Sequence, residues 1–427
     1  MKVLIVGGGG REHAIALKIK ENPEVTALYA APGNGGIAQI ATCLPFKATD
    51  VDGIVRWAAE NKVDFVIVAP DDPLCLGMVD ALAEQGIPAF GPRKNAAIIE
   101  GSKVFSKNLM KKYGIPTAAY ETFDDYDAAV KYLQTADMPI VVKADGLALG
   151  KGVLICPDRE NAVEAVASMM KEAKFGASGA RVVIEEFLTG PEVSVLAFTD
   201  GKTVKPMVSS MDHKRALDHD EGLNTGGMGT IAPNPCYTPE LAQRCMDEIF
   251  LPPIAAMNAE GRTFTGCLYF GLMMTPKGPK VIEYNCRFGD PETQVVLPLL
   301  KSDLLTIMRA TVDGTLADTP VEFASGAACC IVLASGGYPV SYKSGYPISG
   351  LDEAGKTATV FHAGTKLVDG QIVTAGGRVL GVTAAADTLE AAIDKAYQAA
   401  DKITFTDMHM RRDIGQRALA SRKESHS

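Results

Sequence analysis

The chain has 427 residues, which is too long for a single hydrophobic core, and about three domains are expected for this length. Its 47% hydrophobic and 22% charged residues are typical of a globular protein. The formal net charge of −9, with no block of lysine or arginine, argues against a nucleic-acid or anionic-membrane surface.

The nine cysteines include no CxxC pair, so we expect reduced, mostly buried thiols and no zinc site. The first apolar run, residues 3–6, is too short for a signal peptide. No stretch approaches the ~18 apolar residues that a membrane helix requires. These features predict a cytoplasmic protein.

The first hundred residues alternate strand-like apolar runs with helical patterns. The predicted elements alternate from first to last. The strands are at 2–6, 25–30, 64–69 and 87–90, and the helices at 11–20, 54–60 and 76–85. Such alternation is typical of a parallel sheet covered by helices on both faces. We therefore predict an N-terminal doubly wound α/β domain over residues 1–101.

After residue 101 the pattern changes. A polar helix at 102–113 is followed by strands at 139–144 and 153–156, and the glycine-rich link between these strands predicts an antiparallel hairpin. The remaining predicted elements are a helix at 160–171, a strand at 181–187, a long functional loop at 209–235, and strands at 266–274, 280–284 and 327–334. We predict a second domain over residues 102–325 and a small β-rich domain over 326–427.

Four consecutive glycines, residues 7–10, follow the first predicted strand and open the first predicted helix. Backbone N–H groups in this setting can bind a phosphate, although a tight turn alone would need only one or two glycines. Glu12 occupies the third glycine position of a dinucleotide fingerprint, which disfavours a nicotinamide cofactor. A second loop, residues 32–36, follows the next strand, so both loops lie where parallel sheets bind ligands.

The glycine-rich link at 146–152 predicts a flap that closes over a nucleotide. It is one residue too short for a P-loop, and Gly152 stands where a Ser or Thr would contact magnesium. Lys143, on the preceding strand, could neutralise phosphate. The alternative is an ordinary flexible hairpin.

Carboxylate side chains lie at the ends of two predicted strands. Glu185 and Glu186 are adjacent, so at most one of them can face a given ligand, and a solvated strand edge is the commoner fate of such pairs. Glu283 and Asn285 lie two residues apart, hence on one strand face, and both offer hard oxygen ligands for magnesium. Arg287 continues this alternation and could bind an anion with two hydrogen bonds. A salt-bridged edge strand is the alternative, and it would leave Asn285 unexplained.

The predicted long loop contains charges of both signs at 212–215, often only a solvated turn, and potential backbone donors at 224–229. His362 and His409 are interpreted as structural.

These segments together resemble the glycinamide ribonucleotide synthetase (phosphoribosylamine–glycine ligase) family of ATP-grasp enzymes. The resemblance covers nearly the whole chain. Its most specific segments are VGGGGREHAIA (6–16), VVKADGLALGKGV (141–153), DHKRALDHDEGLNTGGMG (212–229), EYNCRFGDPETQVVLPLL (283–300) and VFHAGT (360–365).

The resemblance implies a central ATP-grasp domain with a mobile lid at about residues 117–190. ATP would lie between its two lobes, with its phosphates on lysines, its adenine at the strand end 185–188 and its ribose near Glu192. The implied ATP-binding residues are Lys103, Lys143, Lys151, Glu185, Glu186, Phe187, Leu188 and Glu192. Glu283 and Asn285 would bind Mg²⁺ or Mn²⁺.

The same resemblance implies that glycine and 5-phosphoribosylamine meet beside the catalytic residues Asp212, Lys214 and Arg287. The implied substrate-binding residues are Gly9, Gly10, Pro32, Gly33, Asn34, Gly226, Gly227, Met228 and Gly229. The implied reaction phosphorylates the glycine carboxylate, and the amine then displaces phosphate to give glycinamide ribonucleotide in purine biosynthesis. Such an acyl phosphate divides one difficult step into two easier ones. We expect a monomer whose partners are these small molecules.

Several positions depart from the family pattern. Asp71 stands where glutamate is usual, Met211 where glutamine is usual, and Pro191 replaces the first glutamate of a pair. The strand at 268–274 has no carboxylate to serve as an additional metal ligand. The alternatives are another ATP-grasp carboxylate–amine ligase and a non-catalytic nucleotide-binding regulator. The regulator is disfavoured because the chain retains the residues expected for phosphoryl transfer, Lys143, Glu283, Asn285 and Arg287.

Overall fold

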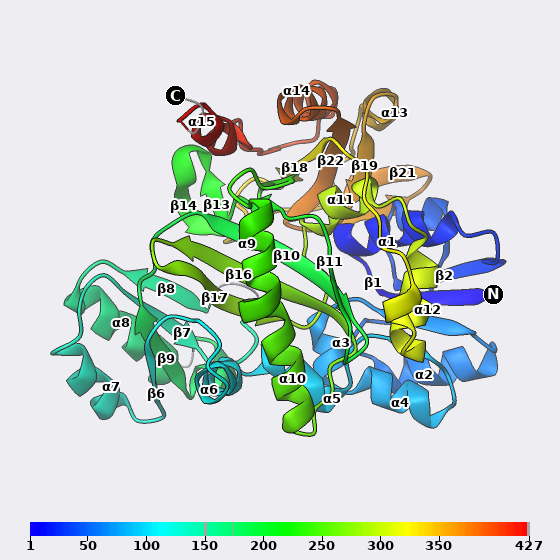
Figure 1. The fold of residues 1–427 in the computed structure, drawn as a ribbon. Helices are drawn as coiled ribbons and strands as arrows, with labels where there is room; N and C mark the ends of the chain where they lie inside the picture. Colours follow the sequence, from blue (N-terminus) through cyan, green and yellow to red (C-terminus); the bar gives the residue numbers. More distant parts are fainter. Residues whose placement is uncertain (149–151, 173, 425–427) are drawn as a thin grey trace.

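The computed structural model describes residues 1–148, 152–172 and 174–424. The N-terminal part is a five-stranded parallel sheet in the order β3-β2-β1-β4-β5, which confirms the predicted parallel sheet. Its strands β1 and β2 are labelled at the right of Figure 1. In β1, Val3, Leu4, Ile5 and Val6 are fully buried, as expected for a central strand covered on both faces. The elements of this part are β1 (Lys2–Gly7), α1 (Gly10–Lys20), β2 (Ala27–Pro32), β3 (Thr42–Cys43), α2 (Val51–Glu60), β4 (Phe65–Val68), α3 (Asp71–Cys75), α4 (Met78–Glu84), β5 (Ala89–Phe90) and α5 (Lys94–Gly101).

The helix predicted at 76–85 is confirmed as α4, whereas the short helix α3 that precedes it was not predicted. Two helices, α3 and α4, meet at Gly77, whose φ of 86° is left-handed and ends the first helix. Glycine adopts this conformation without a Cβ penalty, so the chain can turn here between two short helices.

The central part contains two four-stranded antiparallel sheets, in the orders β6-β9-β7-β8 and β11-β10-β16-β17. The antiparallel pairing of β7 with β8 confirms the predicted hairpin. The elements are α6 (Lys103–Lys112), β6 (Tyr120–Phe123), α7 (Tyr126–Leu133), β7 (Ile140–Ala144), β8 (Val153–Cys156), α8 (Arg159–Met170), β9 (Val182–Glu186), β10 (Glu192–Thr199), β11 (Val204–Pro206), α9 (Pro239–Cys245), α10 (Leu251–Ala259), β16 (Gly266–Thr275) and β17 (Gly278–Asn285).

The stretch 209–235, predicted to be a long loop, contains four short strands. These are β12 (Met211–Asp212), β13 (Arg215–Leu217), β14 (Glu221–Asn224) and β15 (Gly229–Ala232). β13 and β14 form a hairpin, whereas β12 and β15 join the C-terminal sheet, in the order β12-β15-β18-β22-β19. β15 pairs with β18 about a hundred residues later, and no local pattern reveals such a partner. The C-terminal sheet therefore crosses the boundary predicted at residue 325.

The C-terminal part adds a hairpin and helices to this sheet, and its last three helices lie at the top of the molecule in Figure 1. Its elements are α11 (Thr293–Val296), α12 (Leu304–Asp313), β18 (Ala327–Ala334), α13 (Leu351–Gly355), β19 (Thr359–His362), β20 (Thr365–Val368), β21 (Gln371–Thr374), β22 (Arg378–Ala386), α14 (Leu389–Ala400) and α15 (Gln416–Glu424).

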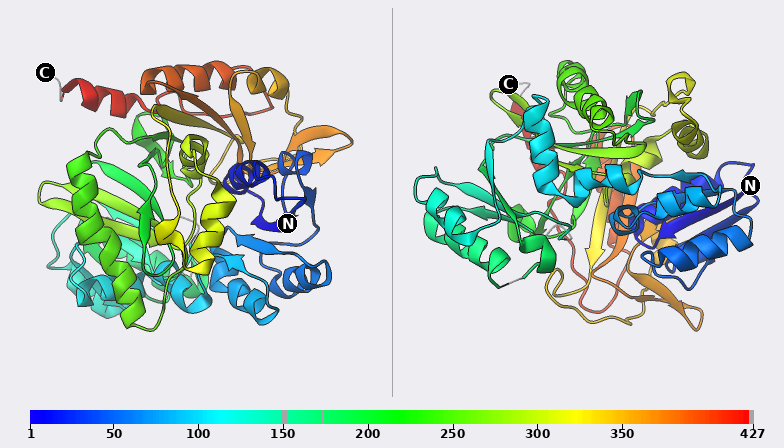
Figure 2. Two further views of the ribbon diagram at one scale, coloured as in Figure 1. Left: turned by 45° about the vertical axis from the view of Figure 1, so that its right-hand side comes forward. Right: turned by 90° about the horizontal axis from the view of Figure 1, so that it is seen from below.

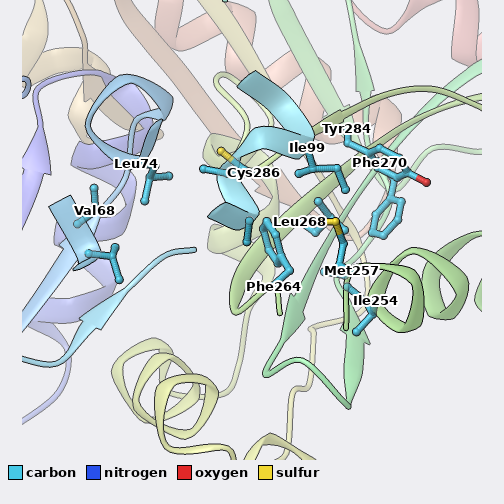
Figure 3. Close-up of a cluster of buried hydrophobic side chains, with 14 of the residues drawn as sticks. Val68, Leu74, Ile99, Ile254, Met257, Phe264, Leu268, Phe270, Tyr284 and Cys286 are labelled. Carbon is cyan, nitrogen blue, oxygen red and sulfur yellow. The ribbon is translucent and has the colours of Figure 1, made fainter. Parts of the chain in front are cut away.

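One apolar cluster joins the N-terminal part to the central part (Figure 3). Val68 and Leu74 of the N-terminal part belong to the same buried cluster as Leu268, Phe270 and Tyr284 of β16 and β17. The sheet β6-β9-β7-β8 and its helices α7 and α8 instead have a separate cluster. Figure 2 shows this unit at one side of the molecule, away from the N-terminal sheet. No helix among the described residues is both long enough and apolar enough to cross a membrane.

Candidate active site

A cavity of about 1130 Å³ lies where the parts of the molecule meet. Lys143 of β7 and Glu283 of β17 line it from the two antiparallel sheets, and Arg378 of β22 lines it from the C-terminal sheet. Asp71 and Arg11 contribute from the N-terminal part. Most candidate residues converge here although they are far apart in the sequence.

A buried carboxylate holds two lysines in the wall of the cavity. Glu185 of β9 forms an ion pair with Lys143 of β7, and a second one, at 2.6 Å, with Lys107 of α6. Burial alone would raise the pKa of Glu185, but Lys143 and Lys107 together hold it below its ordinary value. Burial also lowers the pKa of Lys107 to about 8. The Glu185 side chain is therefore engaged with these lysines.

The adjacent residue, Glu186, differs from Glu185 in its exposure to solvent. Glu186 is exposed and lies 3.6 Å from Lys280, whereas Glu185 is buried. Both glutamates line the cavity, so the expectation that at most one of them faces a given ligand stays a prediction. Phe187 and Leu188 follow Glu186 and line the cavity.

Lys103 begins α6 and also faces the cavity, where its Nζ donates to the carbonyl oxygen of Gly146 at 3.0 Å. It therefore lies beside the glycine-rich link. Lys151, also predicted to bind ATP, lies outside the described residues.

Glu283 is at the centre of a group of cations. Lys214 Nζ lies 3.8 Å from Glu283 and 3.6 Å from Glu192. Burial would raise the pKa of Glu283, but Lys214, followed by Lys143 and Lys103, holds it below its ordinary value. Glu192 is the largest cause of the raised pKa of Lys214. Carboxylates thus neutralise the lysines of this cavity.

Asn285 and Arg287 both contact Glu100 of α5. The hydrogen-bond partners orient the Asn285 amide so that its nitrogen donates to Glu100 Oε1 and to the Tyr284 carbonyl oxygen, both at 3.1 Å. Arg287 Nη2 donates to the same Oε1 at 3.0 Å. All three residues Glu283, Tyr284 and Asn285 border the cavity, but Tyr284 is buried in the apolar core whereas Glu283 and Asn285 are only partly buried, so the strand alternates in burial as predicted.

Two buried acids form a second group. Burial, and next the charge of Glu292, raise the pKa of Asp212 well above its ordinary value. Burial also raises the pKa of Glu292. The Tyr269 hydroxyl donates to Glu292 Oε1 at 3.1 Å and lies 2.8 Å from Ser194 Oγ. A carboxylate whose pKa is raised by a neighbouring carboxylate is suited to a cationic ligand.

Of the predicted glycine-rich segment 226–229, only Gly226 lines the cavity. Arg378 Nη1 donates to its carbonyl oxygen at 2.8 Å and to that of Asp290 at the same distance. Gly227 has a φ of 121°, and a Cβ there would collide with Pro291 and Asp212. Met228 is fully buried, and Gly229 pairs with Ile331 in the C-terminal sheet.

The N-terminal glycine loops pack against one another and do not line this cavity. Asn34 Nδ2 donates to the carbonyl oxygens of Gly8 and His362, at 2.9 and 2.7 Å. The backbone N–H of Gly9 donates to Glu12 Oε2 at 2.7 Å. The predicted residues of these loops that lie outside the cavity lining are Gly9, Gly10, Pro32, Gly33 and Asn34. Their role in substrate binding stays a prediction.

Several cavity residues were not predicted from the sequence: Arg11, Glu100, Tyr269, Glu292 and Arg378. Asp71, noted there only as a departure from the family pattern, also lines the cavity. Arg11 follows the glycine run and Glu292 lies in the segment 283–300, so their positions next to recognised motifs could have indicated a role in the site. Glu100 and Arg378 gave no such indication, since only the folded chain brings them to the cavity.

Three family models match the chain. The phosphoribosylglycinamide synthetase N domain matches residues 1–100, its ATP-grasp (A) domain residues 101–293, and its C domain residues 328–417. The phosphoribosylamine–glycine ligase of Halalkalibacterium halodurans is 48% identical over 425 residues, which are 100% of this chain and 99% of the relative. That of Pasteurella multocida is 46% identical and covers 100% of both chains.

Solved structures of similar fold point to the same family as the sequence comparisons. The crystal structure of phosphoribosylamine–glycine ligase from Thermotoga maritima has a TM-score of 0.86 and 34% identity, and the match covers 97% of this chain and 100% of that one. The biotin carboxylase domain of 2-oxoglutarate carboxylase from Hydrogenobacter thermophilus shares the fold alone, with a TM-score of 0.72, 18% identity and coverage of 96% and 91%. The fold and its lysine-lined cavity are those of an ATP-grasp ligase, which confirms the predicted fold class. Within this class, the chain belongs to the phosphoribosylglycinamide synthetase family.

Proposed function

We propose that the cavity joins the carboxylate of glycine to the amine of 5-phosphoribosylamine at the expense of ATP, within purine biosynthesis. The products are glycinamide ribonucleotide, ADP and phosphate. The observation that supports this proposal best is that phosphate-binding lysines and the acidic pair Asp212–Glu292 line one cavity. The family membership supports the same activity.

For ATP, we assign the phosphates to Lys103 and Lys143, which already face the cavity beside the glycine-rich link. Adenine lies at the strand end formed by Glu186, Phe187 and Leu188, and ribose lies near Glu192. Glu185 keeps Lys143 in place through their ion pair.

For Mg²⁺ or Mn²⁺, we assign Glu283 and Asn285. No three histidine, cysteine or acidic residues gather into a metal site within residues 1–148, 152–172 and 174–424. Magnesium commonly takes one or two protein carboxylates and completes its shell with water and substrate phosphates, so the Glu283 carboxylate and the Asn285 amide fit it. When bound, the metal ion would neutralise charge on the transferred phosphoryl group.

For the substrates, the acidic pair Asp212–Glu292 suits the ammonium group of glycine, because that positive charge would favour the ionised carboxylates. Lys214 and Arg287 suit the glycine carboxylate and its phosphate. A carboxylate oxygen attacks the γ-phosphorus of ATP, and the bond to ADP breaks. The amine nitrogen of 5-phosphoribosylamine then attacks the acyl carbon, phosphate leaves with the bridging oxygen, and the nitrogen loses a proton. The ribose phosphate is assigned to the loops with Gly9, Gly10, Pro32, Gly33 and Asn34.

We further propose domains over residues 1–101, 102–325 and 326–427, with a lid over about 117–190. The separate apolar cluster of α7, α8 and their sheet supports a lid that moves as one body. A cytoplasmic monomer without a nucleic-acid partner fits the composition and charge.

The test is ADP release measured with glycine, with and without 5-phosphoribosylamine, and with other amino acids and amines. We expect full turnover only with glycine and 5-phosphoribosylamine together. Equal or faster turnover with another carboxylate–amine pair would favour a different ATP-grasp ligase, and ATP binding without turnover on any pair would favour the regulator.

A further inference from the structure

Glu100 lies at the end of α5, almost two hundred residues before the segment to which the metal is assigned. Its side chain is buried, and its two oxygens accept three hydrogen bonds from consecutive residues of that segment. Oε2 accepts from the Cys286 backbone N–H at 2.7 Å. Oε1 accepts from the Asn285 amide at 3.1 Å and from the Arg287 guanidinium at 3.0 Å.

The contact with Asn285 determines which end of that amide is free. A carboxamide has one oxygen acceptor and one nitrogen donor, whereas an ionised carboxylate only accepts. Glu100 therefore pairs with the amide nitrogen, and the Tyr284 carbonyl oxygen requires the same orientation. The Asn285 oxygen is left on the other side of the group. A metal ion needs that oxygen, because the amide nitrogen is no ligand for magnesium.

We propose that Glu100 is a positioning residue for the metal site, which holds the Asn285 oxygen and the Arg287 guanidinium in their working orientations. This inference rests on the proposed assignment of Asn285 to the metal. It also means that the last helix of the N-terminal part, through Glu100, sets the geometry at the end of β17.

The proposal can be tested by exchanging the carboxylate of Glu100 and the carboxamide of Asn285 between the two positions. In Glu100→Gln, the new amide can donate, so only the Tyr284 carbonyl oxygen still favours the original Asn285 orientation, and the Asn285 amide can turn and present its nitrogen to the metal. In Asn285→Asp, two carboxylates face each other at a hydrogen-bond distance and repel. In the double variant Glu100→Gln/Asn285→Asp, the glutamine amide donates to one aspartate oxygen and leaves the other for the metal.

The measurement is Mn²⁺ binding, followed by the loss of the free Mn²⁺ electron paramagnetic resonance signal, with a non-hydrolysable ATP analogue present. We expect Glu100→Gln to weaken Mn²⁺ binding about tenfold or more, while affinity for the analogue without divalent metal stays near wild type. We expect the double variant to bind Mn²⁺ more tightly than either single variant. Glu260→Gln is the matched control, because Glu260 also accepts from two side chains, those of Lys112 and Tyr113, but lies away from the cavity lining.

Wild-type affinity in Glu100→Gln, or a double variant no better than the single variants, would overturn the proposal. If Glu100→Gln does not fold, the comparison of Asn285→Asp with the double variant makes the same test. Failure of the wild-type protein to bind Mn²⁺ would instead overturn the metal assignment itself, and the positioning role with it. The ligase activity is measured separately by ADP release, so its failure is distinguishable from both.

Discussion

At the residue scale, carboxylates of the same chain balance the charges of the cavity lysines, of which Lys143 is buried and Lys214 is partly exposed. Lys143 pairs with Glu185, and Lys214 lies close to both Glu192 and Glu283. A buried charge without a partner is costly, so such pairs stabilise the protein before a nucleotide binds. A phosphate group of the nucleotide can then accept a hydrogen bond from Lys143 with little further loss of hydration, because the Lys143 side chain is already buried away from water.

The clearest consequence concerns Glu283. We expect Glu283→Gln to reduce turnover by two orders of magnitude or more while the fold stays intact, because the change keeps size but removes the charge assigned to the metal. The measurement is steady-state ADP release over a range of Mg²⁺ concentrations, with Glu248→Gln on the surface as the control. Near-wild-type turnover at ordinary Mg²⁺ would contradict the metal assignment.

The acidic pair predicts a change in pH dependence. If ionised Asp212 binds the glycine ammonium, kcat/KM for glycine falls as the pH drops through the pKa of Asp212. The Glu292 charge raises this pKa, so Glu292→Gln should lower it and move the acidic limb of the profile to lower pH. An acidic limb that stays in place in Glu292→Gln would show that the two carboxylates do not titrate together.

At the element scale, the hairpin β7–β8 is the part of the lid nearest the nucleotide site. Leu147, Ala148 and Val153 line the cavity, so a bound nucleotide would contact this hairpin directly. Ordering such a segment requires contacts that offset the entropy lost by its glycines.

We expect amide hydrogen exchange to slow in peptides that cover residues 140–148 and 152–156 when ATP and Mg²⁺ are added. Peptides from β18, which is buried along its whole length, should not change and serve as the control. Unchanged exchange in the hairpin at saturating nucleotide would exclude the lid.

The contact of α1 with β19 includes two buried histidines. His13 Nδ1 accepts from the backbone N–H of His362 at 2.8 Å, and the His362 ring lies 3.0 Å from Thr365 Oγ1. Burial lowers the pKa of His13 to about 3 and that of His362 to about 4. Both histidines are therefore neutral in the folded protein at neutral pH, in agreement with the structural role expected for His362.

This burial predicts acid sensitivity. Below about pH 6.5 the unfolded chain binds protons that the folded chain does not, so the free energy of unfolding falls by up to ~1.4 kcal/mol per pH unit for each histidine. The loss continues down to about pH 4 for His362 and about pH 3 for His13, and above pH 6.5 the contribution is constant. His13→Asn keeps an acceptor for the His362 N–H but does not titrate, so its thermal midpoint should fall less between pH 7 and pH 5. A fall equal to that of the wild-type protein would contradict this account.

Local patterns predicted most elements, because strands such as β1 and β18 are continuous apolar runs bounded by glycine. They failed where the determinant was a distant partner or a single backbone angle. The strand β15 depends on β18, and the break between α3 and α4 depends on the left-handed Gly77.

At the scale of the whole molecule, the site depends on contacts between segments that are remote in the sequence. Motifs predicted that Lys143, Glu283 and Asn285 would serve one site, and all three line the cavity. No motif could reveal that Glu100 pairs with Arg287, or that Arg378 holds the Gly226 carbonyl oxygen. These contacts exist only when the N-terminal part, the central sheets and the C-terminal sheet are packed together.

The central claim is that glycine is activated as an acyl phosphate in this cavity, and oxygen transfer tests it most directly. Glycine labelled with ¹⁸O in both carboxylate oxygens is converted with ATP and 5-phosphoribosylamine, and the released phosphate is analysed by mass spectrometry. The account predicts one ¹⁸O in each phosphate and the other in the amide of the product, because the attacking carboxylate oxygen leaves with phosphorus. Phosphate without ¹⁸O, formed together with product, would contradict it.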